Sequence, residues 1–422
     1  MNIVMMTNTY LPHVGGVARS VESSATWLRD RGHRVLIAAP TFEGASDVEL
    51  GVVRVRAIQH FHGSDFSVPL PLTLRLHRVV ERFEPDLVHS HHPFLLGDTA
   101  LRVAAAFDLP IVFTHHTMYE NYTRYVPLDS PRMKRFVVEL ATGYADLCDA
   151  VFAPSETVAA ILRERGVRTR IEVVPTGVDV ARFAGGDGPE FRSAHGIPAH
   201  AIVVGHVGRL AAEKNLMFLS RVVADHVAAD ARVYALIVGG GTEEEAIRAR
   251  FNERGLGDRL RLAGVLDGRA LASAYRAMDV FAFASKTETQ GLVLAEAMAA
   301  GVPVVALDAP GVREVVCDRV NGRLLPEEDS SAFVSALIWA TSADARSRLA
   351  AGIARTAMDY SIDSTGRKAL AVYDGLERDA RRGVDAKSAW AAARRRIRKE
   401  SILLSHRAQT LRHAWPSPKA SL

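Results

Sequence analysis

The chain has 422 residues, of which 48% are hydrophobic and 24% charged, so it is long and apolar enough for two globular domains. Its two cysteines, Cys148 and Cys317, are too few for a disulfide framework and are expected to be buried free thiols of a cytoplasmic protein. There is no signal-like N-terminus and no apolar run of membrane-spanning length, so we expect neither secretion nor a transmembrane helix. The net charge of +4 is unevenly spread, because residues 381–422 carry eleven Lys or Arg and two Asp or Glu (11 − 2 = +9), which leaves 4 − 9 = −5 elsewhere.

The first 184 residues are predicted to form a doubly wound α/β domain. Short apolar runs bounded by turn residues alternate with helical segments, as repeated βα units require. The predicted strands are 2–6, 35–38, 52–55, 86–89, 111–113, 150–153 and 171–173. The first strand leads through Gly15 and Gly16 into a helix ending near Asp30, and such a turn allows a phosphate to approach the backbone. A plain tight turn explains the two glycines equally well, and neither a dinucleotide fingerprint nor a P-loop is present.

Two histidine clusters follow neighbouring predicted strands of this domain, His89 to His92 and His115 to His116. No cysteine or carboxylate stands at a matching spacing, so a zinc site is not favoured. The other interpretation is a polar rim at the carboxyl ends of the strands, where neutral imidazoles can bond hydroxyl groups. The loop after the second cluster contains Tyr119, Glu120 and Tyr122, which can also be solvated loop residues.

A linker is predicted at 184–189, where glycine and proline are densest, and a second α/β domain at 190–361. Its predicted strands are 201–207, 233–238, 260–262 and 280–283, with a further segment at 264–266 and a turn into a short helix at 310–314. Helices are predicted at about 330–340 and 344–359, and a last helix at 362–380 is expected to cross back onto the first domain. Arg209 and Lys214 follow the strand 201–207, where two cations can neutralise a diphosphate; an ordinary surface pair is the alternative.

The segment 285–305 follows the strand 280–283 and reads as a polar loop, a helix and a return to the sheet at Gly301 and Pro303. Glu288 lies in the loop and Glu296 about two turns into the helix. This Glu-x7-Glu spacing, followed by Ala-Met-Ala-Ala-Gly-Val-Pro-Val-Val, resembles the donor-sugar motif of the retaining glycosyltransferases of family 4, which have the GT-B fold of two Rossmann-like domains.

The resemblance implies a role for each matching residue. Glu288 would bind donor-sugar hydroxyls, Glu296 the ribose, and Arg209 and Lys214 the donor phosphates, while His116 would lie beside the sugar, with His115 as the alternative. The remaining donor-site positions that it implies are Gly15, Gly16, Leu266, Thr289, Gln290 and Gly291. No metal site is implied and no cofactor is required, and Mg²⁺ is compatible with the site but not indicated, because there is no Asp-x-Asp motif.

His116 to Glu120, taken together with Thr287 to Gly291, resembles the branch of the family that glycosylates diacylglycerol; many soluble members have Phe where Gln290 stands. On this resemblance Tyr119, Glu120 and Tyr122 are acceptor-side candidates. UDP-glucose and diacylglycerol are the favoured substrates, followed by GDP-mannose and phosphatidylinositol-like lipids.

The tail 381–422 repeats large apolar residues every seven positions between 390 and 411, flanked by arginines. We therefore expect a basic amphipathic helix at 386–415 that contacts an anionic membrane surface, the alternatives being a solvated tail or a helix packed on the protein. Nucleic acid is not an expected partner, because no nucleic-acid-binding module accompanies the basic run.

Together these features predict a retaining enzyme that moves a hexose from a nucleotide-diphosphate sugar to a lipid, as a peripheral protein at the cytoplasmic membrane face. One rival is a soluble family 4 transferase acting on a sugar or glycan, and another is a non-catalytic membrane-associated binding protein. A two-carboxylate hydrolase is disfavoured, because Glu288 and Glu296 flank a helix start instead of facing one bond.

Overall fold

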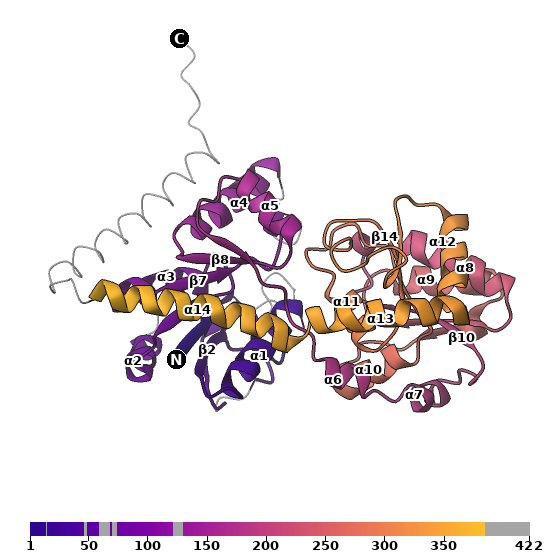
Figure 1. Cartoon of the computed structure of the whole chain (residues 1–422), viewed down its shortest axis with the longest axis horizontal. Coiled ribbons are helices and arrows are strands. Elements are labelled where there is room, and N and C mark those ends of the chain that lie inside the picture. The colour runs from indigo at the N-terminus through magenta and orange to yellow at the C-terminus, as the bar shows by residue number, and fades with distance from the viewer. Residues whose placement is uncertain (14, 46–48, 59–67, 70–73, 121–129, 385–422) are drawn as a thin grey trace, which may run out of the picture. The chain divides into compact units, whose positions relative to one another are not determined.

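The computed structural model describes residues 1–13, 15–45, 49–58, 68–69, 74–120 and 130–384, which form two compact units (Figure 1). The first unit consists of Met1–Pro175 together with the chain from Gly366 onward, and the second of Thr176–Thr365. The sequence suggested a linker at 184–189, but these residues overlap two helices of the second unit, α6 (Val180–Ala184) and α7 (Gly188–Ala194). The chain therefore passes from the first unit to the second between Pro175 and Thr176, before the glycine-rich segment 184–189.

The first unit is built on a seven-stranded sheet in the order β3-β2-β1-β6-β7-β8-β9, with every neighbouring pair parallel. Its strands are β1 (Asn2–Met6), β2 (Arg34–Pro40), β3 (Val52–Val55), β6 (Leu87–Ser90), β7 (Ile111–Thr114), β8 (Ala150–Ala153) and β9 (Ile171–Val173). A separate antiparallel pair joins β4 (Ala57–Ile58) and β5 (Val68–Pro69). The predicted doubly wound arrangement is confirmed.

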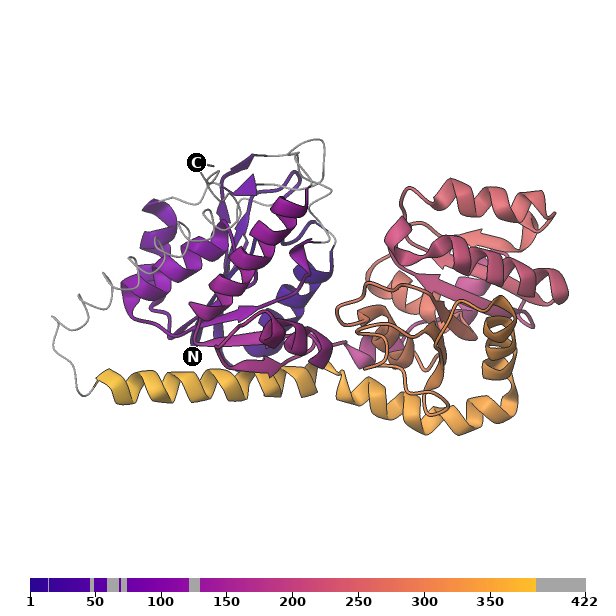
Figure 2. The same ribbon diagram turned by 90° about the horizontal axis from the view of Figure 1, so that it is seen from above.

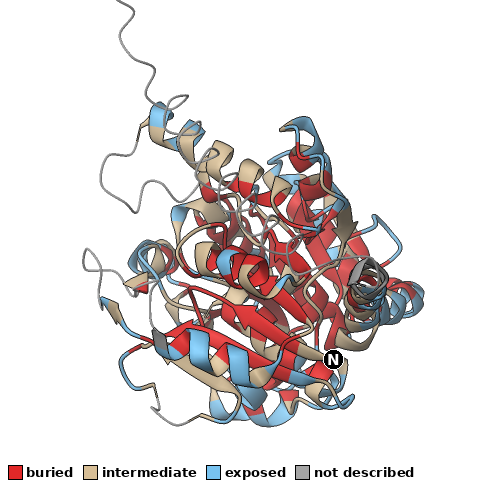
Figure 3. Cartoon of the chain, turned by 90° about the vertical axis from the view of Figure 1, so that its left-hand side faces the viewer, coloured by how far each residue is buried: buried red, intermediate tan, exposed pale blue. Residues whose placement is uncertain are grey.

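Helices surround this sheet: α1 (Gly16–Arg29), α2 (Leu74–Phe83), α3 (Leu96–Phe107), α4 (Pro131–Asp146) and α5 (Glu156–Glu164). Ser130 and Ser155 cap α4 and α5 by accepting hydrogen bonds from the backbone three residues on. Figure 3 shows the strands as buried and the outward faces of the helices as exposed. Cys148 is buried as expected, but Cys317 is exposed, because it lies in a turn region instead of a packed element.

The second unit has a six-stranded parallel sheet in the order β12-β11-β10-β13-β14-β15. The strands are β10 (Ile202–Val207), β11 (Val233–Val238), β12 (Leu260–Leu262), β13 (Val280–Phe283), β14 (Val304–Leu307) and β15 (Gly322–Leu325). Its other helices are α8 (Leu216–Ala229), α9 (Glu244–Glu253), α10 (Gly268–Arg276), α11 (Leu292–Ala299), α12 (Ser330–Thr341) and α13 (Ala343–Asp359), with 3-10 turns η3 (Ala212–Lys214) and η4 (Gly257–Arg259). Residues 310–315 form successive turns and not the predicted short helix.

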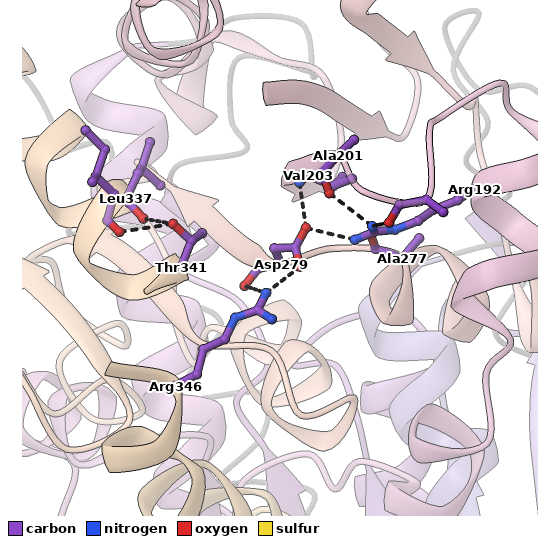
Figure 4. Close-up of polar contacts among 10 residues, drawn as sticks. Arg192, Ala201, Val203, Ala277, Asp279, Leu337, Thr341 and Arg346 are labelled. Atoms are coloured by element: carbon purple, nitrogen blue, oxygen red, sulfur yellow. Dashed lines mark hydrogen bonds and ion pairs between the residues drawn. The ribbon is translucent and has the colours of Figure 1, made fainter. Parts of the chain in front are cut away.

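The Asp279 carboxylate holds α7, which begins in the predicted linker, against the second unit (Figure 4). Asp279, just before β13, accepts hydrogen bonds from the Val203 backbone at 2.7 Å and from Arg192 of α7 at 2.8 Å, and it also pairs with Arg346 of α13. Arg192 donates further to the backbone oxygens of Ala277 and Ala201. One partly buried ion cluster thus ties α7, β10, the start of β13 and α13 together, so α7 belongs to the second unit.

The last described helix, α14 (Ile362–Val384), contains the second passage between units, at Thr365 and Gly366. Gly366 packs so closely on the Trp27 ring of α1 that a Cβ would lie 2.5 Å from it, and Tyr373 is buried in the first unit. Figure 2 shows this part of α14 running beside the first unit. The predicted amphipathic helix at 386–415 and Tyr122 lie outside the described residues. Among the helices that the structure describes, none is long and apolar enough to cross a bilayer.

Candidate active site

Each sheet has a point where the strand order reverses, between β1 and β6 in the first unit and between β10 and β13 in the second. Parallel α/β sheets bind ligands at the carboxyl ends of the strands beside such a point. The loop with Gly15 follows β1, and the first histidine cluster begins in β6 with His89 and continues after it with His91 and His92. In the second unit Arg209 follows β10 and Glu288 follows β13. Gly15, Arg209 and Glu288 therefore follow strands that flank the two reversal points, whereas His116 follows β7 and Leu266 follows β12.

Gly15 is the N-cap of α1 and has an extended backbone, with φ −167° and ψ 160°. Any residue can adopt this conformation, so the backbone does not require glycine here. At Gly16 an added Cβ would meet no described atom within 4 Å. The packing of the described residues therefore does not explain Gly16. The N–H groups at the start of α1 are the donors that the sequence prediction assigned to a phosphate.

Three of the clustered histidines take part in two separate sets of hydrogen bonds. His89 Nε2 lies 2.7 Å from Thr114 Oγ1, and its Nδ1 lies 2.7 Å from the Tyr373 hydroxyl of α14. His91 Nδ1 lies 2.9 Å from His116 Nε2. Burial lowers the pKa of His89 to about 3, and burial with the nearby imidazoles holds the pKa of both His91 and His116 well below the usual range. All three rings are therefore neutral near pH 7.

The contact between His91 and His116 fixes which ring nitrogens carry protons. His91 Nε2 is buried and has no partner among the described residues. An orphan buried N–H is rarer and more costly than an unused acceptor, so we infer that the His91 proton is on Nδ1 and is donated to His116 Nε2. His116 then carries its own proton on Nδ1. The sequence named His116 but passed over His91, although His91 also follows a strand at the reversal point, which was the available signal.

The other predicted residues of the first unit have distinct surroundings. His115 is buried between Phe113 and Tyr119, with ring centroids 5.8 and 5.3 Å away, and burial lowers its pKa to about 4. Tyr119 is also buried, and its hydroxyl has no partner among the described residues. Glu120 forms an ion pair with Arg165 at the end of α5, so it is not a freely solvated loop residue. Of the two candidate histidines, only His116 is bonded to another cluster histidine.

In the second unit the two predicted cations are both held by carboxylates. Lys214 of η3 pairs with Glu288 Oε1, and both side chains are mostly buried, with 21% and 16% exposure. Arg209 pairs with Glu213 at 2.8 Å and is 48% exposed. The Lys214 pair joins the loop after β10 to the loop after β13, so the structure brings together two residues that lie far apart in the sequence.

Glycine loops pack beneath these cations. An added Cβ at Gly239 would lie 1.9 Å from the Gly208 oxygen, so the turn after β11 presses directly on the turn after β10. The Gly239 N–H donates to the Gly264 oxygen at 2.7 Å, which holds the segment of Leu266 beside it. Leu266 itself is half-buried against the core, and its segment forms no strand.

The loop 285–291 ends at Gly291, the N-cap of α11, in the left-handed conformation with φ 74° and with no side-chain cap. Glycine is required there. Thr289 is half-buried, whereas Gln290 is buried and its amide is hydrogen-bonded to the backbone of Thr176.

Glu296, on α11, is 4% exposed and accepts a hydrogen bond from the Tyr275 hydroxyl at 2.8 Å. Tyr275 and Tyr373 carried no signal in the sequence, since an isolated tyrosine in a helical pattern reads as core.

No group of three or more His, Cys, Asp or Glu within the described ranges is arranged to hold a metal ion. The arrangement instead offers cations and helix N–H groups for a phosphate and carboxylates for hydroxyl groups.

Comparison with known proteins agrees with this chemistry. Residues 14–182 match Glycosyltransferase Family 4, and residues 187–355 match Glycosyl transferases group 1. The chain is 28% identical to the alpha-monoglucosyldiacylglycerol synthase of Streptococcus pneumoniae, over 80% of this chain and 78% of that protein. It is 31% identical to a D-inositol 3-phosphate glycosyltransferase of Actinosynnema mirum, over 86% and 93%.

Solved structures show the same fold. Sucrose-phosphate synthase from Thermosynechococcus elongatus superposes with a TM-score of 0.72 and 22% identity, over 89% of this chain and 98% of that one. HepE from Anabaena, in complex with UDP-glucose, superposes with a TM-score of 0.68 and 19% identity, over 89% and 100%. With two parallel-sheet units and matches that cover both, the chain belongs to the family 4 glycosyltransferases of the GT-B fold.

Proposed function

We propose that this glycosyltransferase is a retaining hexosyltransferase that takes a hexose from a nucleotide-diphosphate sugar, with UDP-glucose favoured, and transfers it to a lipid such as diacylglycerol. The observation that carries the proposal is the Lys214–Glu288 pair at the strand reversal of the second unit. A phosphate-binding cation and a hydroxyl-binding carboxylate are in contact there, as a donor with adjacent diphosphate and sugar requires.

The chemistry of each residue follows from its charge and position. Arg209, Lys214 and the N-terminus of α11 stabilise the negative charge that builds on the diphosphate as the glycosidic bond breaks. Glu288 accepts hydrogen bonds from sugar hydroxyls, and Glu296 from the ribose. When a donor phosphate takes over Lys214, Glu288 is released to the sugar. The departing phosphate takes the acceptor proton, so the site needs neither an enzyme nucleophile nor a cofactor, and Mg²⁺ is not required.

Two relatives support a lipid acceptor. One is the alpha-monoglucosyldiacylglycerol synthase, and the other is the sulfoquinovosyl transferase SQD2 of Arabidopsis thaliana, 30% identical over 74% of this chain and 60% of that protein. Gln290 and the residues around His116 also resemble the diacylglycerol branch. We place the enzyme peripherally at the cytoplasmic membrane face, with the basic segment 386–415 as its contact with anionic lipid.

A soluble acceptor is the second candidate. It is favoured by the relative named D-inositol 3-phosphate glycosyltransferase. A GDP-mannose-dependent alpha-mannosyltransferase of Mycobacterium tuberculosis, 30% identical over 77% of this chain and 84% of that protein, supports GDP-mannose as the alternative donor. The two candidates share the donor site and differ in what the first unit binds.

The test is transfer of labelled hexose from UDP- and GDP-sugars, with EDTA present, to diacylglycerol in anionic vesicles or to inositol phosphate. Glu288→Gln is run beside Glu328→Gln, a matched control whose carboxylate pairs with Lys286 in the same unit. We expect an α-linked glycolipid that is lost only in Glu288→Gln. Product on inositol phosphate alone would select the soluble acceptor, and transfer unaffected by Glu288→Gln would remove the proposed site.

A further inference from the structure

The side chain of Gln290 holds the backbone of a residue 114 positions earlier in the chain. Its Oε1 accepts a hydrogen bond from the Thr176 N–H at 2.8 Å, and its Nε2 donates to the Thr176 oxygen at 2.8 Å. These two bonds fix the orientation of the Gln290 amide. In a flipped amide the Nε2 group would face the Thr176 N–H, and Oε1 would face the Thr176 oxygen. Gln290 is 6% exposed, so these two bonds form away from water, where losing them is costly.

Thr176 is the first residue of the second unit, where the chain enters from Pro175. The residues after it pair with the segment that leaves the unit. The Val178 N–H donates to the Tyr360 oxygen at 2.8 Å, and the Ile362 N–H donates to the Val178 oxygen at 2.9 Å. At Gly177 an added Cβ would lie 2.4 Å from both Ile362 Cα and Thr365 Oγ1. The entering and leaving segments, 176–178 and 360–365, therefore form one packed element, which we call the crossing pair.

Gln290 also belongs to the donor loop, 285–291, which carries Glu288. The outer side of this loop is packed as tightly as its contact with Thr176. An added Cβ at Gly311, whose φ is +75°, would lie 2.7 Å from the Glu288 oxygen and 2.9 Å from the Gln290 nitrogen. The loop is thus held between the turn at Gly311 and the crossing pair, and the backbone from Glu288 to Gln290 has little room to move separately from either.

We propose that Gln290 is a positioning residue that couples the donor loop to the crossing pair, so that a displacement of the segments 176–178 and 360–365 changes the place of Glu288. The inference deepens the proposed function, on which its kinetic consequence rests. It gives the buried amide a role in catalysis that requires no contact with the donor. In a two-unit enzyme it links sugar binding to the two places where the chain passes between units.

The direct test needs no substrate. Hydrogen exchange by mass spectrometry is compared for peptides spanning 174–180 and 285–292 in the full-length protein and in Gln290→Leu. The matched control is Asn321→Leu, because Asn321 is a similarly buried amide in the same unit that bonds the Cys317 N–H and the Val315 oxygen at 2.8 and 2.7 Å. We expect exchange about tenfold faster in both peptides of Gln290→Leu and in neither peptide of Asn321→Leu.

A second variant tests whether the crossing pair and the donor loop are coupled, as opposed to each being loosened separately. Gly177→Ala places a methyl group against Ile362 and Thr365 and displaces the crossing pair. We expect it to accelerate exchange in 285–292 when Gln290 is present and to add nothing in the Gln290→Leu background, since the connection is already broken there. Independent, additive effects, or faster exchange at 174–180 with an unchanged donor loop, would overturn the proposal.

The kinetic consequence is measured with the donor identified by the transfer assay. Gln290→Leu is expected to raise the donor KM about tenfold with a smaller change in kcat, whereas Asn321→Leu leaves both within about twofold at a temperature where each variant is folded. A protein that transfers no sugar under any condition refutes the proposed function, while the exchange data still decide the coupling. If the unmodified protein transfers sugar normally but the exchange data show that the donor loop does not respond to the crossing pair, only the coupling is refuted.

Discussion

The Tyr275 hydroxyl donates a hydrogen bond to Glu296 Oε2 at 2.8 Å, and both residues are almost completely buried. Tyr275, on α10, thereby sets the direction in which the Glu296 carboxylate presents its oxygens. In Tyr275→Phe the carboxylate loses this donor while the ring remains in the core. We expect a donor KM about five- to tenfold higher with kcat nearly unchanged, because Glu296 is the residue proposed to bind the ribose. Tyr234→Phe in the same unit is the control, and an equal effect there would contradict the assignment.

Lys214→Met is expected to lower kcat/KM by about a hundredfold or more, because it removes the proposed phosphate contact and leaves Glu288 without its cation. The matched control is Lys286→Met, which removes a more exposed lysine from its pair with Glu328 in the same unit. We expect less than a twofold change there. Initial rates over a range of donor concentrations distinguish the two variants, and comparable losses in both would assign Lys214 a general electrostatic role.

The proton positions of the histidine cluster are directly measurable. Long-range ¹H–¹⁵N spectra of ¹⁵N-histidine-labelled protein are expected to show His116 protonated at Nδ1. His92 is the internal control, because its Nδ1 accepts a hydrogen bond from the Asn8 N–H at 3.1 Å and its proton must be on Nε2. In His91→Phe the preference of His116 should weaken. An Nε2-protonated His116 in the unmodified protein would overturn the inferred direction of the bond.

Acid is expected to destabilise the second unit through His206. Its Nδ1 bonds the Ala282 oxygen at 3.1 Å, and burial lowers its pKa to about 4. The unfolded chain takes up a proton there below about pH 6.5, whereas the folded chain does so only near pH 4, so stability falls as the pH is lowered through this range. At pH 5 this contribution is about 2 kcal/mol.

Urea unfolding between pH 7.5 and 4.5 tests this effect. His206→Phe should weaken the dependence of the unfolding free energy on pH by this contribution, while replacement of the solvent-exposed His200 should leave the slope unchanged. Other buried histidines with a lowered pKa, including His226 in the same unit, supply the rest of the slope. A slope as steep in His206→Phe as in the unmodified protein would contradict the role of His206.

Asp279→Asn should destabilise the second unit by about 2–4 kcal/mol, because two arginines lose their carboxylate partner at a mostly buried position. Asp318→Asn is the comparison, since Asp318 is 43% exposed and pairs with Arg323. Its expected cost is below about 1 kcal/mol. Denaturant midpoints measure both, and equal costs would show that the Asp279 cluster contributes no more than a surface pair.

Much of the fold could be predicted because its signals are local. The strands Val233–Val238 and Val280–Phe283 are short apolar runs, each preceded by a charged residue, and the predicted limits coincide with the observed ones. The linker at 184–189 was misplaced for the opposite reason. Its glycines indicate a loop, whereas α7, which begins in this region, is held through Arg192 by Asp279, far away in the chain.

For the site, the sequence by itself determined which residue types are available: two carboxylates eight positions apart, two cations after a strand, glycines before a helix and histidines at strand ends. Only the tertiary structure decided which of them meet. It paired Lys214 with Glu288, His91 with His116, Tyr275 with Glu296 and Gln290 with Thr176. Backbone geometry and hydrophobic periodicity act over a few residues and can be read along the chain. Hydrogen bonds between distant side chains depend on how the strands are ordered in each sheet, and that order is set by packing of the whole unit.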